Sequence, residues 1–451
     1  MDTQMGETRD LILRDRRNLI CFIISYVINN LVSGVLYDTY VNYLQEVSPS
    51  IATSFWSFYG YATFISALIL ILVPKAGYRK LLVFCSLSCT SALFSVIWFQ
   101  SEVLYYVTTL LSLVGVQLHY IMLSPYVATY TEHLKEKSIN WYTRAYYMGY
   151  IGYFVATYLG GAFVVKMFSL RLGVSYSAAQ KLTEYVTELD AVSMDAYLKG
   201  NCDVLLAVGV ISLLSILPVL FIQERKEDYR VVTENQAEKK PLRERVLEYK
   251  DVLLNRYALC YLAYWSIVSF AMGLFTSYYT VYLNRNLHID KATSSLLVSI
   301  SYIAIVLFMF FTPLAVRKMG QVGTICFSML LSIPFMITIG LGDRFGAAMV
   351  PVVGTALFVR SGLANLSSPV DGALSMAIAP KELRPAFTSM VNFLSGFVSI
   401  LSGMFTGQIL FRTQAGYRYA YFIAAALYAV ATAIIFLGLH KKYNRTHEED
   451  V

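Results

Sequence analysis

The feature that most constrains the fold of this chain is a series of twelve apolar stretches, each long enough to cross a bilayer. A helix needs about 20 mainly apolar residues to span the hydrocarbon layer. Six stretches precede a long charged segment and six follow it: 18–45, 52–73, 81–99, 103–130, 145–165, 203–222, 257–283, 292–315, 321–341, 346–379, 386–410 and 417–439. A soluble fold could not bury so much apolar helix, and a β-barrel would show alternation over about ten residues. We therefore predict an all-α polytopic membrane protein with 12 transmembrane helices in two six-helix halves.

The distribution of positive charge predicts how these helices are oriented. With the N-terminus inside and the helices alternating, 26 of the 36 lysines and arginines fall in inside segments and nine fall outside. This asymmetry follows the positive-inside rule, so both termini are expected in the cytoplasm and the protein in the cell inner (plasma) membrane. It also explains the net charge of +7 without nucleic-acid binding. The first apolar run is too long for a cleaved signal peptide.

The charged segment divides the chain into two halves. We predict an N-terminal half over 1–222, a cytoplasmic linker over 223–256, and a C-terminal half with a short cytoplasmic tail over 257–451. The loop 166–202 should lie outside, as one or two short helices beginning near a cap at Ser175.

Short basic turns recur at matching places in the two halves. Val73-Pro-Lys75-Ala-Gly77 corresponds to Val316-Arg-Lys318-Met-Gly320, and Lys135-Glu136 corresponds to Lys381-Glu382. Either match alone could be chance, but the nearly equal offsets favour a duplication, and duplicated halves are typical of transporters.

These turns resemble motifs of the major facilitator superfamily. The turn Lys75-Ala-Gly77-Tyr-Arg79-Lys80 is similar to the end of the family's motif between helices 2 and 3, except that Pro74 replaces the usual Asp. Pro380-Lys-Glu382-Leu-Arg384 resembles the turn after helix 10, and the segment 360–369 resembles helix 10 of bacterial members of drug-exporter-like or unassigned type. The resemblance implies alternating access and assigns gating roles to Lys75, Gly77, Arg79, Lys80, Lys318, Gly320 and Arg384.

The fifth apolar stretch bears on whether the protein resembles the family's drug/proton antiporters. Their Gly-rich pattern in this helix ends in Gly-Pro-x-x-Gly-Gly, whereas this chain keeps Gly160 and Gly161 but has Ala156 and Thr157 in place of Gly and Pro. The small residues still form one face that lets a neighbouring helix approach closely. The antiporter assignment itself stays open.

Polar and aromatic residues recur at helical spacing on the helices that the resemblance puts around a central cavity. Such rings with hydroxyls and amides would suit an aromatic, amphipathic or sugar-like solute, although a tyrosine can also simply pack between helices. The expected solute-binding residues are Tyr26, Asn30, Ser33, Tyr37, Gln117, Tyr120, Ser124, Tyr150, Tyr153, Tyr261, Tyr264, Trp265, Arg360 and Asn365.

Three ionisable residues lie well inside apolar stretches, where a charge is energetically costly and usually serves a function. Asp38 and Asp371 are candidates for binding a coupling ion, a proton or sodium. Arg360, near mid-membrane on the same helical stripe as Asp371, should reach the solute, or Asp38 when the site is empty. Its alternative role is a structural bridge between helices. His119 lies off the polar stripe and should be a packed histidine.

The sequence contains no motif for catalysis or ATP binding, so we predict that the protein is not an enzyme and needs no cofactor. Its six separate cysteines indicate neither a disulfide framework nor a metal site. The leading interpretation is a secondary transporter, acting as a monomer, that exports a small organic or amphipathic solute in exchange for an ion. Ion-coupled uptake of a sugar-like solute and lipid flipping are the alternatives.

Overall fold

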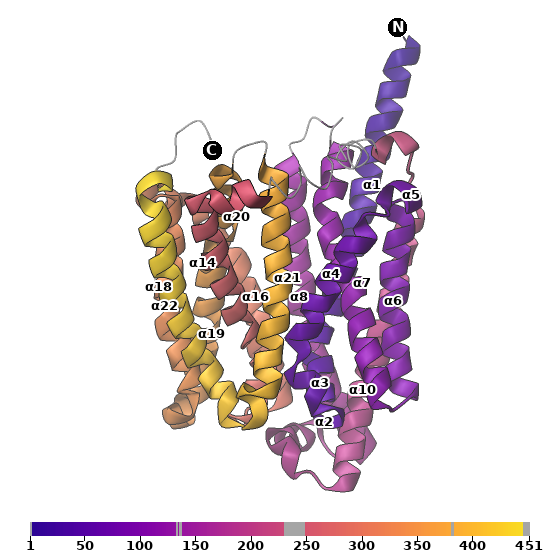
Figure 1. The fold of residues 1–451 in the computed structure, drawn as a ribbon. Helices are drawn as coiled ribbons and strands as arrows, with labels where there is room; N and C mark the ends of the chain where they lie inside the picture. The colour runs from indigo at the N-terminus through magenta and orange to yellow at the C-terminus, as the bar shows by residue number, and fades with distance from the viewer. Residues whose placement is uncertain (1, 132–133, 135–137, 230–248, 380–382, 445–451) are drawn as a thin grey trace.

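The computed structural model of the chain describes residues 2–131, 134, 138–229, 249–379 and 383–444, and the regular elements within these ranges are helices (Figure 1). The N-terminal half contains α1 (Asp2–Val35), η1 (Leu36–Tyr40), α2 (Val41–Val47), α3 (Pro49–Thr53), α4 (Phe55–Leu70), α5 (Val73–Ala76), α6 (Tyr78–Trp98), α7 (Glu102–Thr131), α8 (Ser138–Leu172), α9 (Tyr176–Leu182), η2 (Thr183–Glu188), α10 (Ala191–Leu214), α11 (Ile216–Leu220) and η3 (Lys226–Tyr229). Residues 230–248, the centre of the predicted linker 223–256, lie outside the described residues.

The C-terminal half has a similar series of helices. It contains α14 (Arg256–Gly273), η4 (Thr276–Tyr278), α15 (Tyr279–Arg285), α16 (Lys291–Met309), α17 (Thr312–Met319), α18 (Gln321–Gly340), η5 (Gly342–Ala348), α19 (Met349–Leu366), α20 (Ser368–Ile378), α21 (Arg384–Gln408), η7 (Leu410–Arg412) and α22 (Ala415–Tyr443).

Eleven described helices are long and apolar enough to cross a membrane, and the shorter apolar helix α4 lies at the position of the second predicted span. The predicted all-α fold with twelve membrane segments is therefore confirmed. The loop 166–202 is shorter than predicted, because α8 continues to Leu172 and α10 already begins at Ala191. Between them α9 is capped as expected, since the Ser175 hydroxyl accepts a hydrogen bond from the backbone N–H of Ala178.

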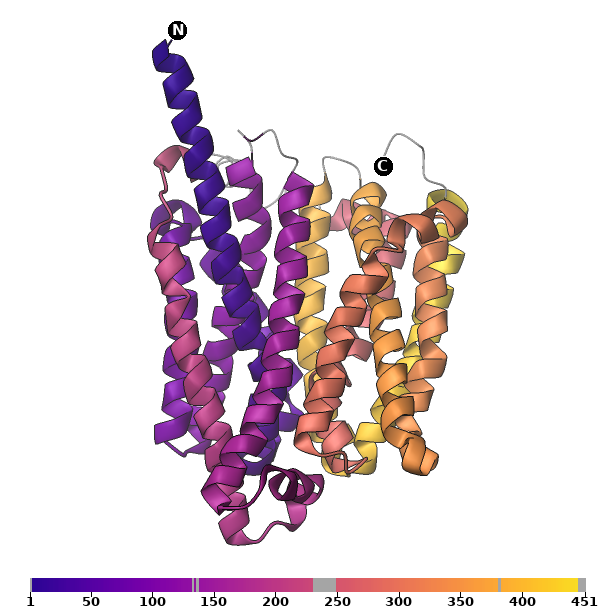
Figure 2. The same ribbon diagram turned by 180° about the vertical axis from the view of Figure 1, so that it is seen from behind.

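The two halves stand side by side, with α1 beginning and α22 ending on the same face of the helix bundle (Figure 2). We call this the terminal face, and we call the opposite face, which carries α9 and η2, the loop face. Two helix pairs join the halves, α8 with α16 and α4 with α21. Small residues allow these close approaches: a Cβ atom added at Gly161 would overlap Ser295, and one added at Gly403 would overlap Ser57.

The first, seventh and tenth spans are broken near the site, which the sequence did not lead us to predict. The first passes through the π-helical turn η1, where the Asn42 side chain donates to the backbone carbonyl of Asp38 at 2.7 Å. The seventh is interrupted between Gly273 and Thr276, and the tenth at Ser367. Pro369 explains the last break, because proline has no N–H to donate to the preceding helical turn. Each break lies beside a residue of the site described below.

The internal repeat is visible in the backbone. Gly77 and Gly320 stand immediately before α6 and α18 with φ values of +80° and +77°, a conformation that favours glycine. Each turn contacts the end of its own half. A Cβ added at Gly77 would meet Glu224, whereas Gly320 lies against Asn444. The second predicted repeat, Lys135-Glu136 with Lys381-Glu382, lies outside the described residues.

Candidate functional site

A cavity of about 310 Å³ lies between the two halves. The N-terminal half contributes side chains from α1, η1, α4, α7 and α8, and the C-terminal half from α14, η4, α15, α16 and α19. Its lining combines aromatic rings with hydroxyls, amides and one guanidinium: Tyr26, Asn29, Asn30, Ser33, Tyr37, Trp56, Tyr59, Val116, Gln117, Tyr120, Tyr146, Tyr150, Tyr153, Met272, Thr276, Ser277, Tyr279, Ser301, Tyr302, Ile305, Arg360, Ser361 and Asn365.

Ten of the residues expected to bind solute line this cavity: Tyr26, Asn30, Ser33, Tyr37, Gln117, Tyr120, Tyr150, Tyr153, Arg360 and Asn365. The other four lie elsewhere in this conformation, and their expected role in binding solute stays a prediction. Ser124 bonds to Tyr142, the Trp265 indole N–H donates to Ser395 at 2.6 Å, and Tyr261 and Tyr264 contact Asp371. All four belong to helix segments on the terminal-face side of the cavity.

Several lining residues belong to helices for which the sequence predicted no solute-binding residue. Trp56 and Tyr59 on α4 stack with ring centroids 4.5 Å apart. Tyr302 on α16 meets Tyr153 of the opposite half at 5.1 Å between centroids. Two sequence patterns could have indicated these lining residues: the aromatic residues at i, i+3 on the second span, and the polar Ser301-Tyr302 pair within the eighth.

The halves are joined by polar contacts at the loop face. Asn42 donates to the Thr280 hydroxyl at 2.8 Å, the Tyr417 hydroxyl donates to Gln45 at 3.2 Å, and Glu46 pairs with Arg285. Tyr278 and Thr406 both donate to the Thr53 carbonyl. Further bonds link η2 and α9 with α15 and with the start of α16. The cavity is therefore closed on this side.

The contacts between the halves are different on the terminal-face side of the cavity. The hydrogen bonds and ion pairs that join two described residues of different halves lie toward the loop face. Nearer the terminal face the halves meet through partly exposed aromatic pairs, Tyr147 with Phe310 and Phe64 with Phe393. Tyr120, which lines the cavity, is 41% exposed. On this side of the cavity, the described residues of the two halves therefore meet mainly through aromatic contacts.

Asp38 takes part in the closure of the loop face. Its carboxylate accepts from Lys291 Nζ at 2.7 Å and from the Ser295 hydroxyl at 2.9 Å, and both partners belong to α16 of the other half. The Asp38 and Lys291 side chains are 2% and 0% exposed. The expectation that Arg360 pairs with Asp38 was therefore wrong. Lys291 was overlooked because it stands just outside the apolar run that begins at 292.

Arg360 is buried within the C-terminal half. Nη1 donates to the Tyr279 hydroxyl and Nη2 to the Tyr428 hydroxyl, both at 2.8 Å, and the guanidinium lies 4.4 Å from the Phe275 ring centroid. A mid-membrane arginine costs about 2.5–3.5 kcal/mol on insertion scales. Neutral hydroxyls and a cation–π contact offset only part of a charge's lost hydration.

Asp371 lies beyond the break in the tenth span and does not line the cavity. The break at Ser367 removes it from the helical stripe that would have aligned it with Arg360. Its buried carboxylate accepts from the Tyr264 hydroxyl at 3.1 and 3.3 Å. None of the ion pairs between described residues involves it.

The turn with the expected gating residues Lys75, Gly77, Arg79 and Lys80 does not reach the neighbouring half in this conformation. The backbone N–H of Arg79 donates to Glu224, which follows the sixth span of the same half. Burial raises the pKa of Glu224, although the bonds that it accepts favour the charged form. Lys318 and Gly320 lie at the equivalent turn, and Arg384 begins α21. A gating role for these residues stays a prediction.

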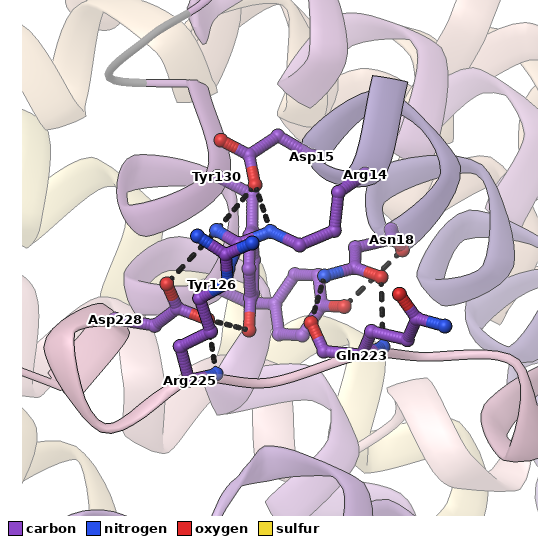
Figure 3. A network of polar contacts seen from close by, with 8 residues as sticks. All are labelled: Arg14, Asp15, Asn18, Tyr126, Tyr130, Gln223, Arg225 and Asp228. Carbon is purple, nitrogen blue, oxygen red and sulfur yellow. Dashed lines mark hydrogen bonds and ion pairs between the residues drawn. The ribbon is translucent and has the colours of Figure 1, made fainter. Parts of the chain in front are cut away.

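A polar network fixes the segment that carries Glu224 onto the terminal face (Figure 3). Asn18 exchanges two hydrogen bonds with the Gln223 backbone, at 2.7 and 3.0 Å. Arg14 pairs with Asp228 at 2.9 Å, and the Tyr130 hydroxyl donates to the same carboxylate. The start of the linker is thereby held against α1 and α7.

Comparison with known proteins agrees with this architecture. Residues 266–450 match the Major Facilitator Superfamily. The matched stretch lies in the C-terminal half and covers less than half of the chain. By the length and composition of its described helices the chain is a multi-pass membrane protein, and its C-terminal part is similar to members of that superfamily. Among curated proteins, none matches the sequence.

Solved structures of low sequence identity share the fold over nearly the full chain. A mutant of the nucleoside transporter NupG has 15% identity and a TM-score of 0.70, covering 93% of this chain and 99% of its own. A D-xylose-proton symporter has 14% identity and a TM-score of 0.66, covering 95% and 100%. A bacterial homolog of the human lysosomal transporter Spinster has 12% identity and a TM-score of 0.64, covering 96% and 99%.

Proposed function

We propose that this protein is a secondary transporter that moves one small, ring-bearing organic solute through the central cavity by alternating access. The observation that carries the proposal is the asymmetry of the cavity. Both halves line it, polar bonds between the halves close it at the loop face, and we infer that it opens at the terminal face, where described residues of the two halves meet through aromatic contacts. Rocking of two repeats about a fixed central site would reverse this asymmetry.

The size and chemistry of the cavity support a small solute. A volume of about 310 Å³ is at the lower end of the range for small-molecule sites, which favours a compact solute over a lipid. Tyrosine and tryptophan rings would stack on a planar or sugar ring, and the amides of Asn30, Gln117 and Asn365 would bind its polar groups. The names of two similar structures, a nucleoside transporter and a xylose symporter, agree with such a solute.

We also propose that transport is coupled to an ion, because the sequence lacks an ATP-binding motif. Asp38 and Asp371 are the buried carboxylates that could bind a proton or sodium. Release of Lys291 from Asp38 would expose one of them whenever the loop face opens. The sequence favours export, whereas the similarity to a proton symporter favours uptake.

A solute screen tests the function. We expect one or more of a panel of nucleosides, pentoses and aromatic acids to raise the Tm of the purified protein, since a ligand that binds only the folded form stabilises it. Tyr153→Ala should remove this shift, and Tyr419→Ala, at a site 53% exposed, should keep it. The active compound should then cross proteoliposome membranes in response to an ion gradient. The assay will show the direction of transport. No shift and no transport with any compound would contradict the proposal.

Membrane orientation is a separate prediction. We propose that the terminal face is cytoplasmic, because 26 of the 36 lysines and arginines belong to segments on that side of the predicted topology. Reporters at the N-terminus, near Glu238 and at Val451 should all indicate the cytoplasm, and one inserted near Thr187 the outside. An external signal at Val451 would contradict the twelve-helix topology.

A further inference from the structure

Arg360 is the one charged side chain among the described residues that line the cavity. It is 3% exposed, and none of the ion pairs between described residues involves it. The cavity therefore carries an uncompensated positive charge.

The other buried cations in the described part of the chain are compensated by an opposite charge. Lys291 has Asp38, and Arg14 has Asp15 and Asp228. Arg360 has only the two tyrosine hydroxyls, and these are neutral. A buried charge is ordinarily paired. The lack of an anion beside Arg360 among the described residues therefore indicates that its partner arrives from outside.

The guanidinium also keeps donors free. Each Nη atom donates one hydrogen to a tyrosine and has a second one, and the buried Nε–H has no partner. Phe275 lies against the guanidinium and the two tyrosines bind its Nη atoms, which together restrict its orientation. A fixed planar fork with free donors is suited to donating two parallel hydrogen bonds to a carboxylate.

We propose that the transported solute is a ring-bearing organic acid and that Arg360 binds its carboxylate. This inference rests on the proposed transport function and specifies its substrate class. One guanidinium with no second cation in the cavity balances a monoanion, so it favours a carboxylate over a phosphate monoester, which carries close to two charges at neutral pH. The cavity rings would hold the rest of the molecule.

The test compares matched acids and amides on purified wild-type protein by thermal shift and calorimetry. The probes are benzoate, 4-hydroxybenzoate and indole-3-acetate, their neutral amides, phenyl phosphate, uridine and xylose. We expect at least one carboxylate to bind while its amide and phenyl phosphate do not. Arg360→Gln should weaken the binding of that carboxylate by roughly 30-fold or more, the loss typical of removing one partner of a buried charge pair. Arg360→Lys, without the fork, should be intermediate.

Arg418→Gln is the matched control, because Arg418 forms an exposed pair with Asp343, and it should keep full affinity. Equal binding of acid and amide by the wild-type protein would overturn the inference, and that measurement needs no variant to fold. Full affinity of Arg360→Gln for the carboxylate would also overturn the inference. If uridine or xylose alone binds and is transported, the proposed function stands and the inference fails. Without binding or transport of any probe, both fail.

Discussion

Replacing Lys291 by methionine is expected to destabilise the protein by about 3–5 kcal/mol, the typical cost of leaving one member of a buried ion pair alone. Asp38 would keep its bond from Ser295 but lose its cation, in a site where both side chains are almost fully buried. For a helical half of this size the loss corresponds to a fall in Tm of roughly 10 °C.

Two further variants make this result specific. Asp38→Asn combined with Lys291→Met should recover most of the stability, because no uncompensated charge then remains. Lys199→Met breaks an exposed pair with Asp195 and should cost less than about 1 kcal/mol. A Tm for Lys291→Met equal to that of Lys199→Met would contradict a tightly closed loop face.

The membrane-spanning architecture could be predicted from the sequence because hydropathy alone determines which segments can cross a bilayer. The repeated turns were also informative, since Gly77 and Gly320 adopt the same left-handed conformation. The helix breaks were harder to predict. Only Pro369 marks one of them, whereas the π-helical turn at Asp38 depends on contacts with Asn42 and α16.

Helical periodicity predicted which face of a helix points inward, but not how far along the axis the cavity extends. Tyr153 and Gln117 line it, whereas Tyr264 and Trp265 occupy a part of α14 closer to the terminal face. The pairing of Asp38 with Lys291 could not be predicted either. It joins residues 253 positions apart in different halves, and its cation lies just outside an apolar run.

The second large effect is expected from fixing the loop face shut. The Asn42 side chain lies 2.8 Å from the Thr280 hydroxyl, each in a different half. Cysteines at both positions, in a background without the six native cysteines, should be joined by a short bifunctional cross-linker that forms a disulfide bond with each thiol and is released by reduction. Alternating access requires these positions to separate in every cycle, so the linked protein should bind solute from the terminal face but not release it at the loop face.

Transport by this cross-linked protein is the most direct test of the mechanism. Proteoliposomes would be assayed with the solute that the screen identifies, before and after cross-linking and again after reduction. We predict that transport falls to the background level on cross-linking, recovers on reduction, and is unchanged in either single-cysteine variant. Undiminished transport by quantitatively cross-linked protein would contradict alternating access through the central cavity.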